Sequence, residues 1–282
     1  MAILNRQEIE DAASLIDANL AYARLRQVDL RHRSLAGVNL SHADLREALL
    51  VGADLTGATL RFARLDGADL TGAILRETIL FKADLSGAIL MQACLDGADL
   101  REAVLELAIL SQASLQCADL RNAVLKQASL VRVDLTHALL TLANLALADL
   151  GQASLREADL GGVNLAGAEL MGADLQGASL RGADLRGSHL QGARLVDASL
   201  SWANLRGADL TGADMTGVNL DAAILADTIL VDAVLAGALL GETTLTEEQR
   251  RQVKVLPGGL GGVLLWSKVV RHWQDKSRSD HV

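Results

Sequence analysis

The chain has 282 residues, of which 50% are hydrophobic, yet only 2% are aromatic and one is proline. This composition, dominated by Ala, Leu and Gly, is typical of repeat proteins and disfavours an ordinary multi-layer enzyme. The formal net charge of -9 excludes the overall basic footprint that direct nucleic-acid binding needs.

The sequence predicts neither a targeting segment nor a membrane span. Residues 1–10 lack an apolar run behind a basic head, so they do not form a signal peptide. No stretch of about 18 residues is free of charged and polar groups. We therefore expect a soluble, cytoplasmic protein with no membrane partner.

Residues 1–10 are predicted to form an N-terminal cap that contains a short helix. Asn5 followed by Glu8 has the spacing of an N-cap residue and its capping-box partner, and the helix should run to about Ala13.

Residues 11–245 follow a five-residue repeat. Every fifth residue from Leu15 to Leu245 is leucine except Met215, which makes 47 units, and 37 of them have Ala two residues earlier. Period five fits neither a helix nor a continuous strand. A chain that bends once per unit fits, with the leucine and the small residue inside and the other three positions outside. Arg33 breaks the small-residue rule, and we interpret it as a local bulge, with a ligand contact as the alternative.

The bends require tight turns. In 18 units a glycine follows two residues after the leucine, where a type II turn needs positive φ. Four such corners close a square coil of about 20 residues, and stacked coils pair as in a parallel solenoid.

The repeat resembles the pentapeptide-repeat family. Fourteen units contain Ala-Asp-Leu or Ala-Asn-Leu, as in the segment from Ala53 to Gly57. The resemblance implies an all-β solenoid, namely a right-handed quadrilateral parallel β-helix of about 12 coils with leucine ladders at its centre. It also implies a protein that works through interactions and not through catalysis.

Residues 246–282 are predicted to form a C-terminal helical tail. Thr246 and Gln249 have capping-box spacing and open a helix to about Val255, which Pro257 stops. After a glycine-rich joint, a second helix is expected over residues 263–276. Its apolar face contains Val263, Trp266, Val270 and Trp273.

Three interpretations of the tail stay open. It folds back and caps the rod, or it packs against a second copy to give a homodimer, as the resemblance suggests, or it lies on a membrane surface. The last coil has one outward apolar residue on each face, which favours the first two. These residues are Ile224, Ile229, Val234 and Leu239.

A regular register places residues 20 apart on one face, so surface rows follow from the numbering. One row, predicted to form charge pairs between coils, alternates in sign: Arg24, Asp44, Arg64 and Asp84. Another should form an amide ladder: Asn144, Asn164, Asp184 and Asn204. A third carries large apolar or aromatic side chains: Tyr22, His42, Phe62, Leu142 and Trp202.

Outward apolar residues are the candidates for a protein-binding face, because contiguous exposed apolar surface commonly marks a partner site. The alternative is that they are scattered and have no role. The candidates are Phe62, Ile79, Phe81, Met91, Leu107, Leu139, Leu142, Leu147 and Trp202.

The charge distribution offers a second hypothesis. Residues 151–245 carry a net charge of -7. Some members of the family that the chain resembles imitate duplex DNA and bind DNA gyrase. The simpler interpretation is that Asp before Leu belongs to the repeat consensus and solvates the rod.

No catalytic, metal or cofactor site is predicted. The six histidines do not cluster, and Cys94 and Cys117 fall out of register, so both should be free thiols. The glycines of residues 258–262 lack the context of a phosphate-binding loop and read as a hinge. We therefore expect a non-enzyme without a cofactor.

Overall fold

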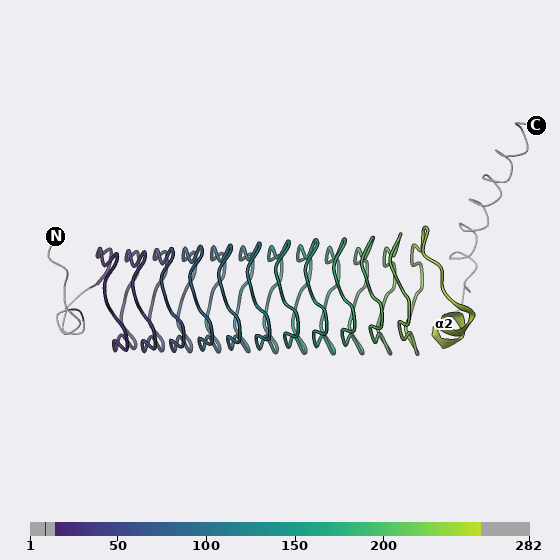
Figure 1. The fold of residues 1–282 in the computed structure, drawn as a ribbon, viewed down its shortest axis with the longest axis horizontal. Coiled ribbons are helices and arrows are strands. Elements are labelled where there is room, and N and C mark those ends of the chain that lie inside the picture. The colour runs from purple at the N-terminus through teal and green to yellow at the C-terminus, as the bar shows by residue number, and fades with distance from the viewer. Residues whose placement is uncertain (1–8, 10–14, 255–282) are drawn as a thin grey trace, which may run out of the picture.

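The computed structural model describes residue 9 and residues 15–254, and it shows a straight rod of stacked coils (Figure 1). The chain advances steadily along the rod, from the purple end to the yellow end of Figure 1. The helix α2, Glu247–Gln252, lies at the far end. Ile9 is helical and buried. The predicted N-cap residues Asn5 and Glu8 lie outside the described residues.

Successive coils pair in parallel with a constant offset of 20 residues. The bridged pairs run without interruption from Asn19 with Asn39 to Asn219 with Leu239. Each face contributes one bridged residue per coil, so the faces are single bridges and not long strands. The predicted square solenoid is therefore confirmed in its register.

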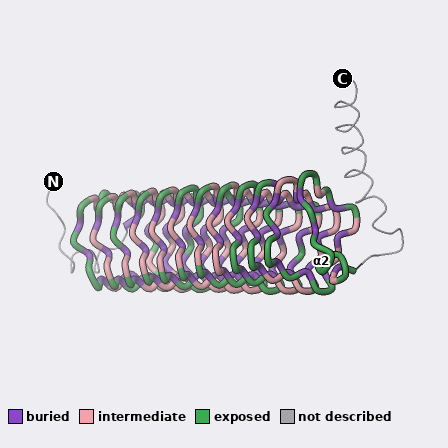
Figure 2. Tube along the Cα trace, turned by 45° about the vertical axis from the view of Figure 1, so that its right-hand side comes forward, coloured by how far each residue is buried: buried purple, intermediate pink, exposed green. Residues whose placement is uncertain are grey.

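The leucine and the small residue of each unit point into the rod. Almost all of them are fully buried, whereas the outward positions form its half-buried and exposed surface (Figure 2). Burial of one leucine side chain contributes about 1.5–3 kcal/mol. Polar exceptions inside are bonded to the backbone, as Thr78 Oγ1 donates to the Leu55 carbonyl at 2.9 Å. The bore thus accepts a narrow set of side chains and leaves aromatics outside.

The predicted bulge at Arg33 is wrong. Its amide N–H closes the usual turn to the Leu30 carbonyl at 3.2 Å, and its own carbonyl accepts from the Asp54 N–H at 2.9 Å. The backbone therefore passes through this unit in regular register, because the long side chain of Arg33 sits half-buried at the first coils without disturbing the ladder.

The corner two residues after each leucine has a left-handed backbone. Its φ is positive from Asp17 to Gly237 without exception, although 27 of these corners are not glycine. The expectation that glycine marks this conformation was therefore too narrow. Hydrogen bonds across the turn and to the next coil hold each corner, as at Leu142, whose N–H donates to the Gly161 carbonyl at 2.9 Å. Such over-determination tolerates a locally unfavourable backbone.

The corners form four rows along the rod, which we name edges after their first residues. They are the Asp17 edge, the Tyr22 edge, the Gln27 edge and the His32 edge, each continuing every 20 residues. The Tyr22 edge and the His32 edge lie on opposite corners of the square.

The Asp or Asn before each leucine stabilises the following turn. Asp54 Oδ1 accepts from the Thr56 backbone N–H at 3.0 Å and from its hydroxyl at 2.6 Å. Where the second residue after Asp is arginine, a bidentate ion pair forms instead, as between Asp44 and Arg46. Asx turns of this kind satisfy the local backbone. The repeated carboxylates are thus part of the corner structure.

This local bonding corrects the predicted charge row. Asp44 pairs with Arg46 of its own coil at 2.6 Å, and Arg64 lies 3.5 Å from Asp66. The shorter path within a coil wins over pairing between coils. The amide ladder is confirmed only in part, because Asn164 donates to Asn144 at 3.1 Å whereas Asp184 binds Arg186.

Helix α2 closes the C-terminal end of the bore. Its capping box is confirmed, since the Thr246 side chain accepts from the Gln249 N–H and the Gln249 side chain accepts from the Thr246 N–H. The helix is shorter than predicted, because Val253 already has extended dihedrals. Lys254 then resumes the coil register by pairing with Val234.

Candidate functional site

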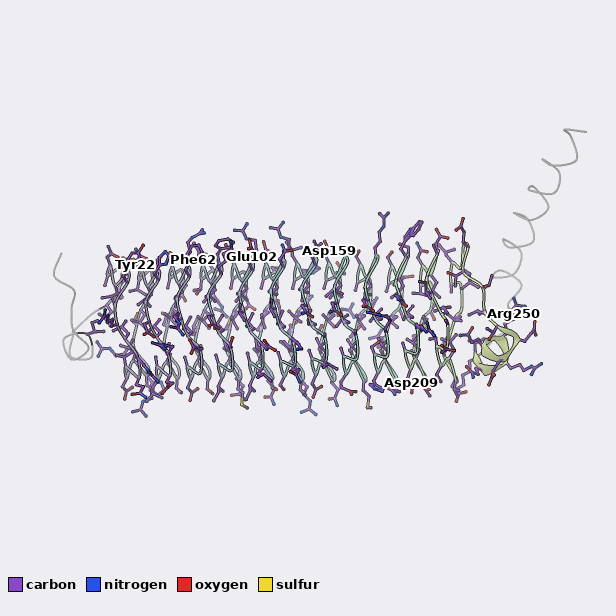
Figure 3. All side chains as sticks on the ribbon, in the orientation of Figure 1. Tyr22, Phe62, Glu102, Asp159, Asp209 and Arg250 are labelled. Carbon is purple, nitrogen blue, oxygen red and sulfur yellow. The ribbon has the colours of Figure 1, made fainter. Side chains whose placement is uncertain are left out.

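Three rings stack along the N-terminal part of the Tyr22 edge. The ring centroids of Tyr22 and His42 are 4.7 Å apart with planes at 2°, and those of His42 and Phe62 are 4.9 Å apart at 11°. The spacing between coils, about 4.8 Å, matches the stacking distance of aromatic rings. Figure 3 shows Tyr22 and Phe62 on the same edge of the rod. Tyr22 is 68% exposed and Phe62 is 42% exposed, so the stack borders solvent.

Phe81 extends this stack toward the preceding face. Its ring meets Phe62 edge-on, with centroids 5.7 Å apart and planes at 85°. Three cations lie close to the Phe81 ring: Lys82 Nζ at 5.2 Å, Arg61 Cζ at 5.6 Å and Arg101 Cζ at 5.7 Å. Such cation–π contacts stabilise both partners and fix the long basic side chains over the ring. The result is a rigid group of aromatic and basic side chains.

Most charges around Phe81 are neutralised within the rod. Arg101 Nε lies 2.7 Å from Asp99 and 3.6 Å from Asp119, and Lys82 Nζ lies 3.1 Å from Glu102. The hydrogen bond from Arg101 lowers the pKa of Asp99 and keeps it ionised. Within the described residues Arg61 makes no ion pair. Arg61 is therefore the basic group of this cluster that remains free for a partner's carboxylate.

The other partner-binding candidates separate into two groups. Ile79 and Leu139 lie on the face that precedes the Tyr22 edge, and Leu142 and Trp202 lie on the edge itself, 63% and 62% exposed. With Phe62 and Phe81, these residues share one side of the rod. The remaining candidates are elsewhere: Leu107 and Leu147 on the Gln27 edge and Met91 beside the His32 edge. The structure thus concentrates six of the nine candidates around one edge.

The basic residues beside Phe81 were not among the predicted site residues. Arg61 and Arg101 share the position before the Tyr22 edge with Phe81, one coil to either side. The 20-residue register alone places them there, so this signal was present in the sequence. Only the side-chain conformations show that all three cations approach the same ring.

The candidate cap residues on the last coil are largely uncovered in the described part of the chain. Ile224, Ile229 and Leu239 are exposed by 51%, 42% and 59%, and Val234 is half-buried beside Lys254. The other cap candidates, Trp266, Val270 and Trp273, lie outside the described residues.

A shallow depression of about 480 Å³ lies on the Gln27 edge. Its corners at Gly67 and Gly87 lack side chains, which leaves the surface hollow between the flanking coils. It is lined by Glu47, Asp66, Gly67, Ser86, Gly87, Glu106 and Leu107. Hydrogen bonds from Gln27 and Arg26 lower the pKa of Glu47, so this carboxylate is engaged within the rod. The depression is open and has no arrangement of groups suited to catalysis.

The potential chemical groups of the described residues are dispersed. Cys94 and Cys117 are free thiols, and Cys94 Sγ accepts from Arg76 Nε at 3.1 Å. Across residues 15–254 no three His, Cys, Asp or Glu side chains gather in a way that could hold a metal ion. Among these residues there is also no helix with the length and apolar character needed to cross a membrane.

Comparison with known proteins agrees with this architecture. The family model for pentapeptide repeats matches overlapping segments that begin with residues 13–52 and end with residues 193–230. No curated protein matches the chain. The solved structures that it resembles include HetL, a pentapeptide repeat protein involved in heterocyst differentiation regulation in the cyanobacterium Nostoc sp.. HetL is 39% identical, over 72% of this chain and 85% of HetL, with a TM-score of 0.45.

Two further structures show the range of the similarity. A trypsin-treated form of QnrB1, a plasmid-mediated fluoroquinolone resistance protein, is 18% identical over 73% of this chain and 89% of QnrB1, with a TM-score of 0.49. Rfr23 from the cyanobacterium Cyanothece is 32% identical over 39% of this chain and 64% of Rfr23, with a TM-score of 0.13. The family model covers far more than half of the sequence, and the HetL match extends over most of both chains. The chain belongs to the pentapeptide-repeat family.

Proposed function

We propose that this protein is a non-enzymatic, rigid interaction rod that binds a protein partner through the N-terminal part of the Tyr22 edge. The observation that carries the proposal is the aromatic stack of Tyr22, His42 and Phe62 with Phe81 against it. Rigid, exposed aromatics surrounded by basic side chains are typical of energetic hot spots at protein interfaces. Because stacked coils fix their spacing, little conformational entropy is lost when a partner binds.

The chemistry of the cluster indicates what the partner presents. Phe62 and Phe81 offer an apolar surface, and Arg61 offers a guanidinium without an ion-pair partner in the described residues. A partner segment with an apolar side chain followed by a carboxylate satisfies both groups. The remaining exposed residues of this edge, Leu142 and Trp202, extend the surface toward the other end of the rod.

Site-specific photo-crosslinking tests this proposal. A benzoylphenylalanine is placed at Phe62, or at Gln112 on the opposite His32 edge as the matched control, and cross-linked proteins from the native host are identified. We expect one protein to be captured from position 62 and not from position 112. The double variant Phe62→Ser and Phe81→Ser, with the photoreactive residue moved to Tyr22, should lose this capture while its circular dichroism is unchanged. Capture that persists in the double variant, or equal capture from both edges, would refute the proposal.

A second candidate function is imitation of duplex DNA on a topoisomerase. It is favoured by the net charge of -7 over residues 151–245. Against it, the carboxylates of this half lie on all four sides of the rod, and several are engaged locally, such as Asp184 with Arg186 and Asp174 with Arg156. A supercoiling assay with DNA gyrase decides the matter. Inhibition, or protection of the enzyme, would support mimicry, and no effect at a large excess of the rod would exclude it.

A further inference from the structure

We propose that residues 255–282 of the same chain dock on the C-terminal end of the Tyr22 edge and cover the apolar residues of the last coil. The docking surface, which we call the end patch, consists of Ile224, Leu239, Asp221 and Glu242. Leu239 is 59% exposed and Ile224 is 51% exposed, on the two faces that meet at this corner. In the rest of the rod these bridged positions are covered by neighbours on both sides.

The end patch lacks its next coil. The regular pairing offset would place residue 244 against Ile224, yet the last regular bridge on the preceding face joins Asn219 to Leu239. Helix α2 replaces only the inner part of the missing coil, because Gln249 Nε2 donates to the carbonyls of Leu225 and Thr228. The outer apolar side chains of the last coil are thus left without the layer that covers equivalent residues elsewhere.

The chain cannot supply this layer by continuing the solenoid. Lys254 keeps the register with Val234, so the next corner falls at residue 257, 20 residues after Gly237. Every corner from Asp17 to Gly237 has positive φ. Residue 257 is proline, whose ring fixes φ near -65°. The segment after Lys254 must therefore leave the coil at this corner.

The exit point and the length of the tail suit the end patch. Residues 255–262 separate Lys254 from the apolar pattern that starts at Val263, and eight residues reach up to about 26 Å. Leu239 lies five residues beyond Val234 along the coil, so the path to it is at most about 17 Å. The four glycines among residues 258–262 allow the reversal of direction that docking requires.

Charge and apolar pattern are complementary between tail and patch. The tail carries Val263, Trp266, Val270 and Trp273 at helical spacing, with Lys268 and Arg271 off this face. Residues 205–245 contain six carboxylates and one basic residue, Arg206, which lies 3.4 Å from Asp227. At the patch itself, Asp221 and Glu242 have no basic partner within the described residues. Lys268 and Arg271 would provide one.

A second copy of the rod fits this surface less well. Stable protein interfaces bury about 800 Å² on each partner, and the end patch offers two large apolar side chains. A tail on the same chain is held near the patch by an eight-residue connection, which gives it a high effective concentration. A small patch therefore suffices for the chain's own tail and not for a separate molecule.

Tryptophan fluorescence tests the proposal on the full-length protein. The chain contains three tryptophans, so Trp202→Phe leaves Trp266 and Trp273 as reporters of the tail. We expect blue-shifted emission and protection from acrylamide, compared with a synthetic peptide of residues 255–282, and neither should change on dilution. Leu239→Glu together with Ile224→Glu should restore the emission and quenching of the free peptide. Glu242→Lys should move both part of the way, and added salt should weaken the protection of the parent.

Matched controls separate docking from damage to the rod. Leu142→Glu, on the same edge but far from the patch, should leave the tail signal unchanged. Circular dichroism of the Leu239→Glu and Ile224→Glu variant should show an intact solenoid. Free-peptide emission in the parent, or emission unaffected by the patch substitutions, would overturn the proposal. Protection lost on dilution together with a halved mass in light scattering would assign the patch to a second copy, and a blue shift only with anionic vesicles would assign the tail to a membrane.

Discussion

The side-chain amide nitrogen of Gln249 lies 2.8 Å from the carbonyl oxygen of Leu225, a group that would otherwise bond to the next coil. The same nitrogen lies 3.1 Å from the Thr228 carbonyl, and Gln252 Oε1 accepts from the Leu230 N–H at 3.1 Å. Two glutamine side chains of α2 thus replace backbone partners that the end of the solenoid lacks. The cap works by hydrogen bonding as well as by covering the bore.

Gln249→Ala should therefore destabilise the C-terminal end. Gln249 is 5% exposed, and its loss leaves the Leu225 and Thr228 carbonyls without partners. We expect a loss of about 2–3 kcal/mol in the free energy of unfolding, from urea titration. The control is Arg250→Ala on the same helix, whose side chain reaches only Glu247 at 3.4 Å. Equal effects of the two substitutions would contradict the capping role.

The inside and outside of one repeat unit can be compared directly. Leu140 is fully buried, whereas Leu142, two residues later, is 63% exposed. Leu140→Ala should cost about 2–5 kcal/mol because it leaves a cavity in the leucine ladder. Leu142→Ala should change stability by less than about 0.5 kcal/mol. Chemical denaturation of both variants checks this, and similar losses would show that the burial pattern is wrong.

Glycine corners should differ in their tolerance of a side chain. Gly37 and Gly57 have nearly the same φ, +67° and +65°. A Cβ at Gly37 would lie 2.0 Å from Asp17 Oδ1, whereas a Cβ at Gly57 would meet nothing within 4 Å. Gly57→Ala should cost about 1–2 kcal/mol for the left-handed backbone alone, and Gly37→Ala should cost more. Thermal melting checks the order, and a Gly37→Ala variant as stable as Gly57→Ala would contradict it. Asp17→Ala should remove the difference.

Stability should fall in acid. Hydrogen bonds at the corners lower the pKa of Asp54, Asp99 and Asp184, with Thr56, Arg101 and Arg186 as the main donors. A carboxyl whose pKa is lower in the folded state stabilises the fold above its unfolded pKa of about 3.9, and this contribution disappears as pH falls through the folded value. The melting temperature should thus be nearly constant from neutral pH down to about 5 and decrease below about 4.

One substitution isolates this contribution. Asp54→Asn keeps an acceptor for the Thr56 N–H but removes the titrating group, so its stability deficit at neutral pH should be about 0.5–1.5 kcal/mol. The deficit should shrink at pH 3, where Asp54 of the parent gains a proton. A deficit that is constant with pH would show that the carboxylate charge does not matter at this corner.

The repeat itself was predictable because it is encoded locally. Each unit carries its own inward leucine and small residue, and an uninterrupted count fixes the 20-residue register that joins Asn19 to Asn39 and continues along the rod. The row of Tyr22, His42 and Phe62 followed from that count. Corners did not need glycine, however, because cross-coil hydrogen bonds hold a left-handed backbone even at Leu142 and Trp202.

The amino-acid sequence by itself determined the family, the square register and which side chains lie inside, since these depend on a periodic backbone and on the volume that the bore accepts. Only the tertiary structure decided which surface groups bind one another. Asp44 binds Arg46 and not Arg64, because a partner two residues away is reached without spanning a coil. Likewise Arg61, Lys82 and Arg101 converge on Phe81 from three coils, a choice of side-chain conformation that spacing along the chain does not contain.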